Sequence, residues 1–155
     1  MRDRKLNKEF YKKAMLTQEE FNYIITLKKE FKVHDQITLQ SKWSRDIVAI
    51  ETRDMFILDY YVGAIALTKF TYNKRYRKII AILRFDSSGR HTNPDGQVFD
   101  GSHVHIYREN YGDKWAFPII EIGISNEMIE KASVLESFLQ YCNVVNYPQI
   151  QPILF

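Results

Sequence analysis

Residues 55–85 read MFILDYYVGAIALTKFTYNKRYRKIIAILRF, and this stretch decides the fold. It contains three runs rich in β-branched and aromatic residues, at 56–62, 66–72 and 78–85. Runs of this composition favour strands, and a polar break such as 72–77 favours a reversal of the chain between two of them. The stretch therefore predicts three consecutive strands of an antiparallel meander.

Shorter runs of the same kind extend the predicted sheet in both directions. Residues 37–39 and 47–50 precede the meander, and the polar break 51–54 separates the second of these runs from it. Two further strands are predicted near 103–109 and 115–120. All these strands are expected to belong to one antiparallel sheet.

A helix is predicted to begin at Thr17. Glu20 follows three residues later, which is the spacing of a capping box, and Leu16 and Phe21 have the spacing of a hydrophobic staple. The apolar residues that follow at helical spacing predict one buried face as far as about Phe31.

A second helix is predicted after the last strand, with Ser125 as its cap. Its apolar residues recur every three or four positions: Met128, Ile129, Ala132, Leu135, Phe138, Leu139 and Cys142. The fold class predicted is α+β, with one curved antiparallel sheet, or a half-open barrel, and a helix at each end of the chain.

Length and composition predict a single domain. The chain has 155 residues, of which 45% are hydrophobic and 26% charged, as in ordinary globular proteins. No apolar run approaches the roughly 18 residues that cross a membrane, and no signal peptide is recognisable, so we expect no membrane partner. The single cysteine excludes an internal disulfide framework, which favours a reducing, cytoplasmic location.

The basic character of the sequence is concentrated in residues 1–14, which are predicted to form an N-terminal arm before the domain at 15–155. The arm carries a net charge of +4, whereas the whole chain carries +3, so the domain itself is close to neutral. Such an arm is able to touch phosphate, although like-charge runs are more often solvated tails.

Ionisable and turn-forming residues gather in 84–115, RFDSSGRHTNPDGQVFDGSHVHIYRENYGDKW, with 87–102 predicted as a long loop. Alternation in a strand at 103–109 places His103, His105, Tyr107 and Glu109 on one face. In the strand 78–86, Lys78, Ile80, Ile82, Arg84 and Asp86 share a face in the same way. If these strands pair, Arg84 and Asp86 lie beside the two histidines, with Arg90 and His91 above them.

Metal-free acid–base chemistry on RNA is the first use that this set suggests. His91 and either His103 or His105 would transfer protons, and Asp86 would orient a histidine. The residues expected to contact phosphate or a partner are Arg84, Arg90, Arg108, Lys114, Lys74 and Arg75. This interpretation needs no cofactor.

Two alternatives use the same residues differently. His103, His105 and Glu109 have the ligand order and spacing of the first cupin motif, which would bind a metal, but no second block of ligands follows. In the other alternative the histidines are structural, for instance stacked on Tyr107, and Asn93–Gly96 is simply a turn.

A resemblance to a known family rests on three blocks of the sequence. They are MLTQEE at 15–20, RFDxxGRHxNPDG at 84–96 and HxHxYxExYGDKWAxP at 103–118. These blocks resemble an uncharacterised family of small bacterial and phage proteins, a domain of unknown function, over about 15–120. The resemblance implies a bacterial or mobile-element origin and no particular activity. A fainter likeness links the histidine pattern to the TumE-like toxins of toxin–antitoxin pairs.

The sequence therefore predicts a small intracellular RNA-acting protein, a metal-independent ribonuclease toxin of a toxin–antitoxin or phage-conflict system. Its partners would be RNA and an antitoxin. The alternative is a non-enzymatic inhibitor, encoded by a phage or mobile element and comparable to an anti-CRISPR protein, that binds a host defence protein through the loop 87–102 and the arm. The oligomeric state does not follow from the sequence.

Overall fold

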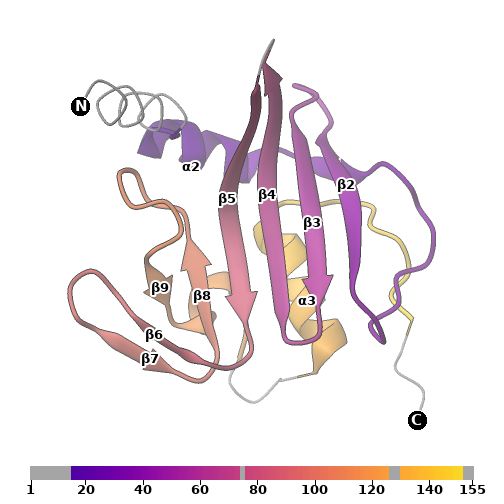
Figure 1. The fold of residues 1–155 in the computed structure, drawn as a ribbon. Helices are drawn as coiled ribbons and strands as arrows, with labels where there is room; N and C mark the ends of the chain where they lie inside the picture. Colours follow the sequence, from indigo (N-terminus) through magenta and orange to yellow (C-terminus); the bar gives the residue numbers. More distant parts are fainter. Residues whose placement is uncertain (1–14, 74–75, 126–129, 152–155) are drawn as a thin grey trace.

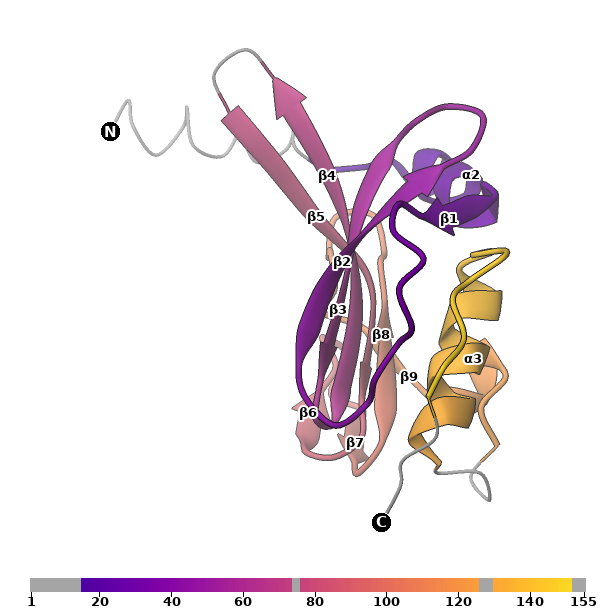
Figure 2. The ribbon, with the colours of Figure 1, turned by 90° about the vertical axis from the view of Figure 1, so that its right-hand side faces the viewer.

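The computed structural model describes residues 15–73, 76–125 and 130–151, so the predicted arm at 1–14 lies outside the described residues. The fold is α+β, as predicted, and its main sheet is curved and open rather than closed into a barrel. Figure 2 shows the sheet edge-on, with both helices on the same side of it.

The main sheet has seven antiparallel strands in the spatial order β1-β2-β3-β4-β5-β8-β9 (Figure 1). Their bounds are Lys29–Phe31 (β1), Trp43–Ala49 (β2), Met55–Tyr61 (β3), Ala64–Asn73 (β4), Tyr76–Asp86 (β5), His103–Ile106 (β8) and Ala116–Phe117 (β9). A separate two-stranded sheet consists of β6, Arg90–Thr92, and β7, Val98–Asp100. The helices are α2, Gln18–Thr26, the 3-10 turn η1, Ile119–Ile122, and α3, Lys131–Tyr141.

Helix α2 begins as predicted but ends early. The Thr17 hydroxyl accepts a hydrogen bond from the backbone N–H of Glu20, and the Glu20 side chain accepts one from the N–H of Thr17. The predicted extension to Phe31 is wrong, because residues 29–31 form β1 and pair with β2. A long-range strand pairing has overridden the local helical periodicity.

Four other predicted boundaries are also wrong. Residues 37–39 form no strand beyond a single bridge from Ile37 to Ile150, and the strand predicted at 115–120 is limited to β9 before Pro118 and η1. The strand predicted at 103–109 ends at Ile106. Helix α3 begins at Lys131 rather than after Ser125, and Met128 and Ile129 lie outside the described residues.

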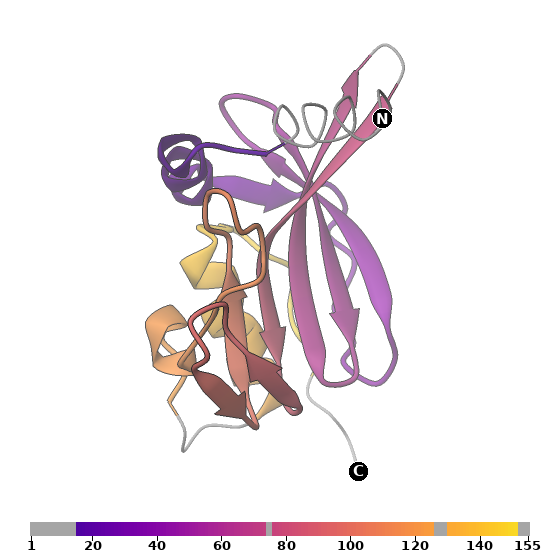
Figure 3. The ribbon, with the colours of Figure 1, turned by 60° about the vertical axis from the view of Figure 1, so that its left-hand side comes forward.

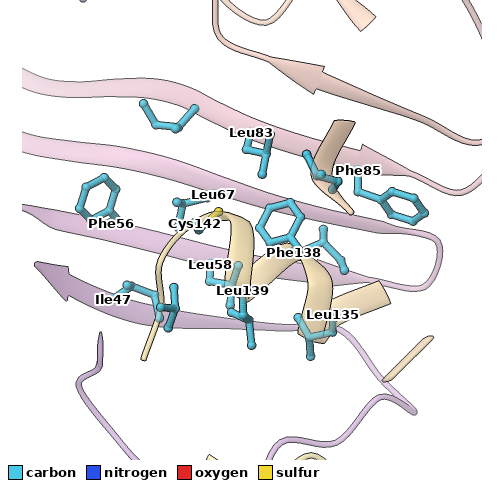
Figure 4. Close-up of a cluster of buried hydrophobic side chains, with 14 of the residues drawn as sticks. Ile47, Phe56, Leu58, Leu67, Leu83, Phe85, Leu135, Phe138, Leu139 and Cys142 are labelled. Carbon is cyan, nitrogen blue, oxygen red and sulfur yellow. The ribbon is translucent and has the colours of Figure 1, made fainter. Parts of the chain in front are cut away.

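The hydrophobic core fills the space between α3 and one face of the sheet (Figure 4). Phe56, Leu67 and Leu83 from the strands meet Phe138 and Cys142 from the helical side. Each such side chain contributes roughly 1.5–3 kcal/mol when fully buried. Burial also raises the pKa of the Cys142 thiol to about 12, which keeps it protonated.

The segments near the two ends of the described chain lie side by side. Lys29 of β1 forms a parallel bridge with Val144, just after α3. Further along, Ile37 forms a second parallel bridge with Ile150. The segment after α3 is therefore fixed to the segment after α2.

A β-bulge in β5 determines which side chains face away from the core. The register between β4 and β5 shifts between Leu67 and Thr68, and consecutive residues Ile82 and Leu83 are both buried in the core. Simple alternation would bury only one of them. The prediction that Ile82 shares a face with Arg84 is therefore wrong, and Arg84 and Asp86 lie on the face opposite the core.

Candidate functional site

The site begins where β5 pairs with β8. Asp86 lies opposite His103, and Arg84 lies opposite His105. This confirms the predicted juxtaposition of the polar end of one strand with the two histidines of the other. Val104, between the histidines, is buried in the core, so both imidazoles lie on the other face of the sheet.

The β6–β7 hairpin covers this face and brings a third histidine. Figure 3 shows the hairpin crossing in front of the last strands of the main sheet. The His91 ring lies edge-on to His105, 4.5 Å between centroids, and 5.9 Å from His103. The Asn93 amide fixes the hairpin, since it donates to the carbonyl of Ala116 at 2.9 Å and accepts from its N–H at 2.8 Å. The predicted loop 87–102 is thus an ordered hairpin.

Hydrogen bonds to backbone carbonyls assign the imidazole tautomers. Nδ1 of His103 lies 2.8 Å from the oxygen of Gly101, and Nδ1 of His105 lies 2.8 Å from the oxygen of Asp113. A carbonyl oxygen only accepts, so both Nδ1 atoms carry the proton. In the neutral rings the lone pairs are therefore on Nε2, which faces Asp86. His91 has the opposite arrangement, because its Nε2 donates to the oxygen of Lys114 at 2.7 Å.

Asp86 joins the two buried histidines. Its Oδ2 lies 3.3 Å from Nε2 of His105 and 3.5 Å from Nε2 of His103. His105 is only 1% exposed and His103 only 3%. Burial by itself raises the pKa of Asp86, but the contacts with His105 and with the guanidinium of Arg84 outweigh it, and the pKa falls below its ordinary value.

Arg84 connects the cluster of Asp86, His91, His103 and His105 to solvent. Its Nε donates to Oδ2 of Asp86 at 3.0 Å, and its Nη2 lies 3.0 Å from Nε2 of His105. Its Nη1 lies 3.3 Å from Oδ2 of Asp113. A guanidinium only donates, so the contact with His105 agrees with a lone pair on Nε2 of that ring. With 38% of its side chain exposed, Arg84 is more accessible than Asp86 or either buried histidine.

A hollow of about 240 Å³ borders the cluster at Asp113. Ile79, Ala81 and Tyr107 supply apolar walls, and Asp113 lies at the side of Arg84. An apolar space next to a charged cluster is a usual setting for a ligand.

Comparison with known proteins places the chain in a family. A family model described as a family of unknown function (DUF6978) matches residues 16–144. The chain belongs to this family. The predicted resemblance to an uncharacterised family is confirmed, while the likeness to TumE-like toxins stays a prediction. No curated protein and no solved structure matches the chain.

In this family member, three of the predicted phosphate-binding residues lie around the cluster rather than in it. Arg90 is exposed on β6, on the opposite face of that strand from His91. The Arg108 guanidinium lies 4.6 Å from the centre of the Trp115 ring. Lys114 has an exposed side chain and contacts His91 through its carbonyl. The two others, Lys74 and Arg75, lie outside the described residues.

Glu109 lies away from the histidines. Its carboxylate accepts from the backbone N–H of Gln18, and β8 has already ended at Ile106. Tyr107 turns into the core, where its hydroxyl donates to the oxygen of Leu16 at 2.6 Å. The prediction that Tyr107 and Glu109 share the histidine face is therefore wrong, and so is the ligand set that included Glu109.

The carboxylate that completes the set is Asp86. Among the described residues, Asp86, His103 and His105 place one ligand atom each within 4.8 Å of one another. Sequence reasoning placed Asp86 beside the histidines but gave it no part in a ligand set. It also missed Asp113 and Asn93, because both act through contacts that no local pattern reveals.

None of the described helices is long and apolar enough to cross a membrane.

Proposed function

We propose that this protein is a small RNA-cleaving enzyme with its centre at the cluster of Asp86, His91, His103, His105 and Arg84. The observation that carries the proposal is the convergence of three imidazoles, a carboxylate and a guanidinium from β5, β6 and β8 on the face of the sheet opposite the core. RNA supplies its own nucleophile, the 2′-hydroxyl. A protein therefore needs only to move a proton and to stabilise the negative charge that develops on the oxygens of the phosphorane.

His91 is the residue best placed to move the proton. It is only half-buried, and its Nε2–H is engaged with Lys114, so the lone pair of the neutral ring is on Nδ1. Nδ1 would take the proton of the 2′-hydroxyl as the 2′ oxygen bonds to phosphorus. The same proton is then returned to the 5′ oxygen as its bond to phosphorus breaks. One imidazole is therefore able to serve the whole step.

Arg84 is the residue best placed to stabilise the phosphorane charge. Its guanidinium is held by Asp86 on one side and Asp113 on the other, which fixes its orientation before a substrate arrives. A preorganised donor of this kind is worth more than a mobile one, because no reorganisation is needed during the reaction. The apolar hollow beside Asp113 supplies a place for a nucleobase.

The cellular setting belongs to the same proposal. Unrestrained cleavage of cellular RNA by this enzyme would arrest growth. We therefore place the protein in a toxin–antitoxin or phage-conflict system, with an antitoxin protein as its partner.

The test is induced expression followed by RNA analysis. Wild type, His91→Ala and Arg84→Ala would be compared for growth and for cleavage of RNA by the purified proteins. His34→Ala is the matched control, since His34 is exposed and lies in the segment between β1 and β2. We expect wild type and His34→Ala to arrest growth and cleave RNA, and the other two variants to do neither at equal soluble levels.

Two outcomes would contradict the proposal. The first is purified wild type that leaves RNA intact, and the second is cleavage that persists in His91→Ala and Arg84→Ala. Wild type that is well expressed and harmless would instead direct the search to a protein partner, as in the inhibitor alternative, beginning with a pull-down.

A further inference from the structure

We propose that Asp86, His103 and His105 bind a divalent first-row transition-metal ion. As a statement about the cofactor of an RNA-cleaving enzyme this rests on the proposed function, but the binding itself is testable without RNA. The proposal replaces both the prediction of a metal-free site and the predicted ligand set with Glu109.

The first support is the spacing of the ligand atoms. Two ligand atoms about 2.0–2.1 Å from one ion in tetrahedral geometry lie roughly 3.4 Å apart. Oδ2 of Asp86 lies 3.3 Å and 3.5 Å from Nε2 of His105 and His103. All three ligand atoms lie within 4.8 Å of one another.

The second support is the arrangement around the imidazoles. Histidines that bind metals usually donate their other ring N–H to a carbonyl or carboxylate, which directs the remaining lone pair to the ion. His103 and His105 both do this, through Nδ1, to the carbonyls of Gly101 and Asp113. Their Nε2 lone pairs are therefore directed at the space beside Asp86. His91, which uses Nε2 for its carbonyl, is not arranged as a third imidazole ligand.

The third support is the rigidity of the site. Asp86 and His103 are paired residues of adjacent strands, and both histidines are almost completely buried. Burying polar groups to this degree costs free energy unless hydrogen bonds or a metal ion satisfy them. Two imidazoles and one carboxylate suit zinc, manganese, iron, cobalt or nickel rather than magnesium, which prefers oxygen.

Arg84 is the competitor for this site. Its guanidinium contacts Oδ2 of Asp86 and Nε2 of His105, both of which the ion would take. Asp113 holds the guanidinium through Nη1 on its other side, so Arg84 is able to keep this contact and stay beside the site when an ion takes Asp86 and His105. Because Arg84 competes with the ion, removing the guanidinium should strengthen metal binding, which is a test with a defined direction.

The experiment titrates the metal-stripped full-length protein with Co²⁺, read by its visible absorption, and with Zn²⁺, read by calorimetry. We expect one equivalent to bind to wild type. Loss of outer contacts alone weakens metal sites by about 10- to 100-fold, so Asp86→Asn and His105→Ala should weaken binding by at least about 100-fold. His34→Ala and Glu109→Gln are matched controls that should bind as wild type does.

Arg84→Met is the decisive variant. It removes a cation that competes for two ligand atoms, so we expect it to bind the ion about tenfold more tightly than wild type. It keeps the three ligands in place, and circular dichroism with urea unfolding would establish that each variant is folded.

The proposal is overturned if wild type binds no stoichiometric metal, if Asp86→Asn binds as wild type does, or if Arg84→Met binds more weakly. Because no RNA enters these titrations, metal binding without RNA cleavage counts against the proposed function and not against the metal site. Cleavage that persists in chelator, with no metal bound, counts against the ion as a cofactor of cleavage and not against the proposed function.

Discussion

The Nζ atom of Lys29 lies 2.8 Å from the carbonyl oxygen of Cys142, although 113 positions separate the two residues. The same amine donates to the carbonyls of Ile24 and Leu27, both at 2.8 Å. Lys29 is completely buried. Carbonyls at helix ends lack intrahelical partners, so one amine here satisfies the C-terminal ends of both α2 and α3.

Lys29→Met should destabilise the protein strongly. Methionine fills a similar space but leaves three buried carbonyl oxygens without this donor, each of which carries a desolvation cost. We expect a loss of about 3 kcal/mol in the free energy of unfolding, measured by urea titration. Lys28→Met, a neighbour with an exposed side chain, is the control and should change it by less than about 0.5 kcal/mol. Equal effects of the two substitutions would contradict this account.

The stability contribution of Lys29, taken as the difference between wild type and Lys29→Met, should rise between about pH 8 and pH 10. The buried Cys142 thiol, whose pKa is raised to about 12, opposes this rise above about pH 9 in both proteins, so the difference isolates Lys29. Burial lowers the pKa of Lys29 from 10.5 to about 8 in the folded protein. Within that window the unfolded chain still binds the proton that the folded protein has released, so raising the pH favours the folded state, by about 2 kcal/mol over the window.

Below pH 8 both states bind the proton and Lys29 contributes no slope. Above about pH 10.5 the contribution of Lys29 should level off, because the unfolded chain then also releases this proton. Burial raises the pKa of Tyr60, Tyr107 and Tyr141 as well, and their ionisation lowers the stability of both proteins at high pH. Urea unfolding at half-unit steps of pH measures the profile. A profile in Lys29→Met as steep as that of wild type would assign the rise to another group.

Asn93→Ala should loosen the β6–β7 hairpin from the main sheet. It removes both hydrogen bonds that tie the hairpin to Ala116 and leaves a buried N–H and carbonyl without these partners. We expect a loss of about 1–3 kcal/mol and faster amide hydrogen exchange at 90–92 and 98–100. Exchange in β3 should change less, and uniform acceleration across the sheet would show a global effect instead.

Arg84 and Arg108 should differ in their effect on RNA cleavage. Removing a preorganised charge-stabilising donor typically lowers kcat by about 100- to 1,000-fold, which we expect for Arg84→Ala. Arg108 is held over Trp115 outside the cluster, so Arg108→Ala should change kcat by less than about threefold and act mainly on KM. A large kcat loss in Arg108→Ala alone would move the phosphate site to the 108–115 turn.

The central strands could be predicted because their information is local. Strands β3, β4 and β5 are long runs of β-branched and aromatic residues, and the structure contains all three. The end of α2 could not be predicted in this way, because Lys29–Phe31 forms β1 only when residues 47–49 are present to pair with it. The β5 bulge is likewise invisible in the sequence, since it depends on the register with β4.

The part of the candidate site that depends on local sequence was predicted, and the part that depends on long-range contacts was not. Alternation at the end of β5 and the start of β8 was enough to bring Asp86 to His103 and His105. The choice of Glu109 failed because β8 ends where Tyr107 turns to bond Leu16, 91 positions earlier in the chain. No spacing rule contains a contact of that range.

The parallel bridges from Lys29 to Val144 and from Ile37 to Ile150 bear on synthesis at the ribosome. A ribosome adds about 5–20 residues per second. The 113 positions between Lys29 and Cys142 therefore correspond to about 6–23 s of elongation. Throughout that interval the amine of Lys29 lacks its partner at Cys142, and the core side of the sheet lacks α3. The nascent chain completes its core only after α3 emerges, and until then it presents a surface that chaperones or a protein partner are able to bind.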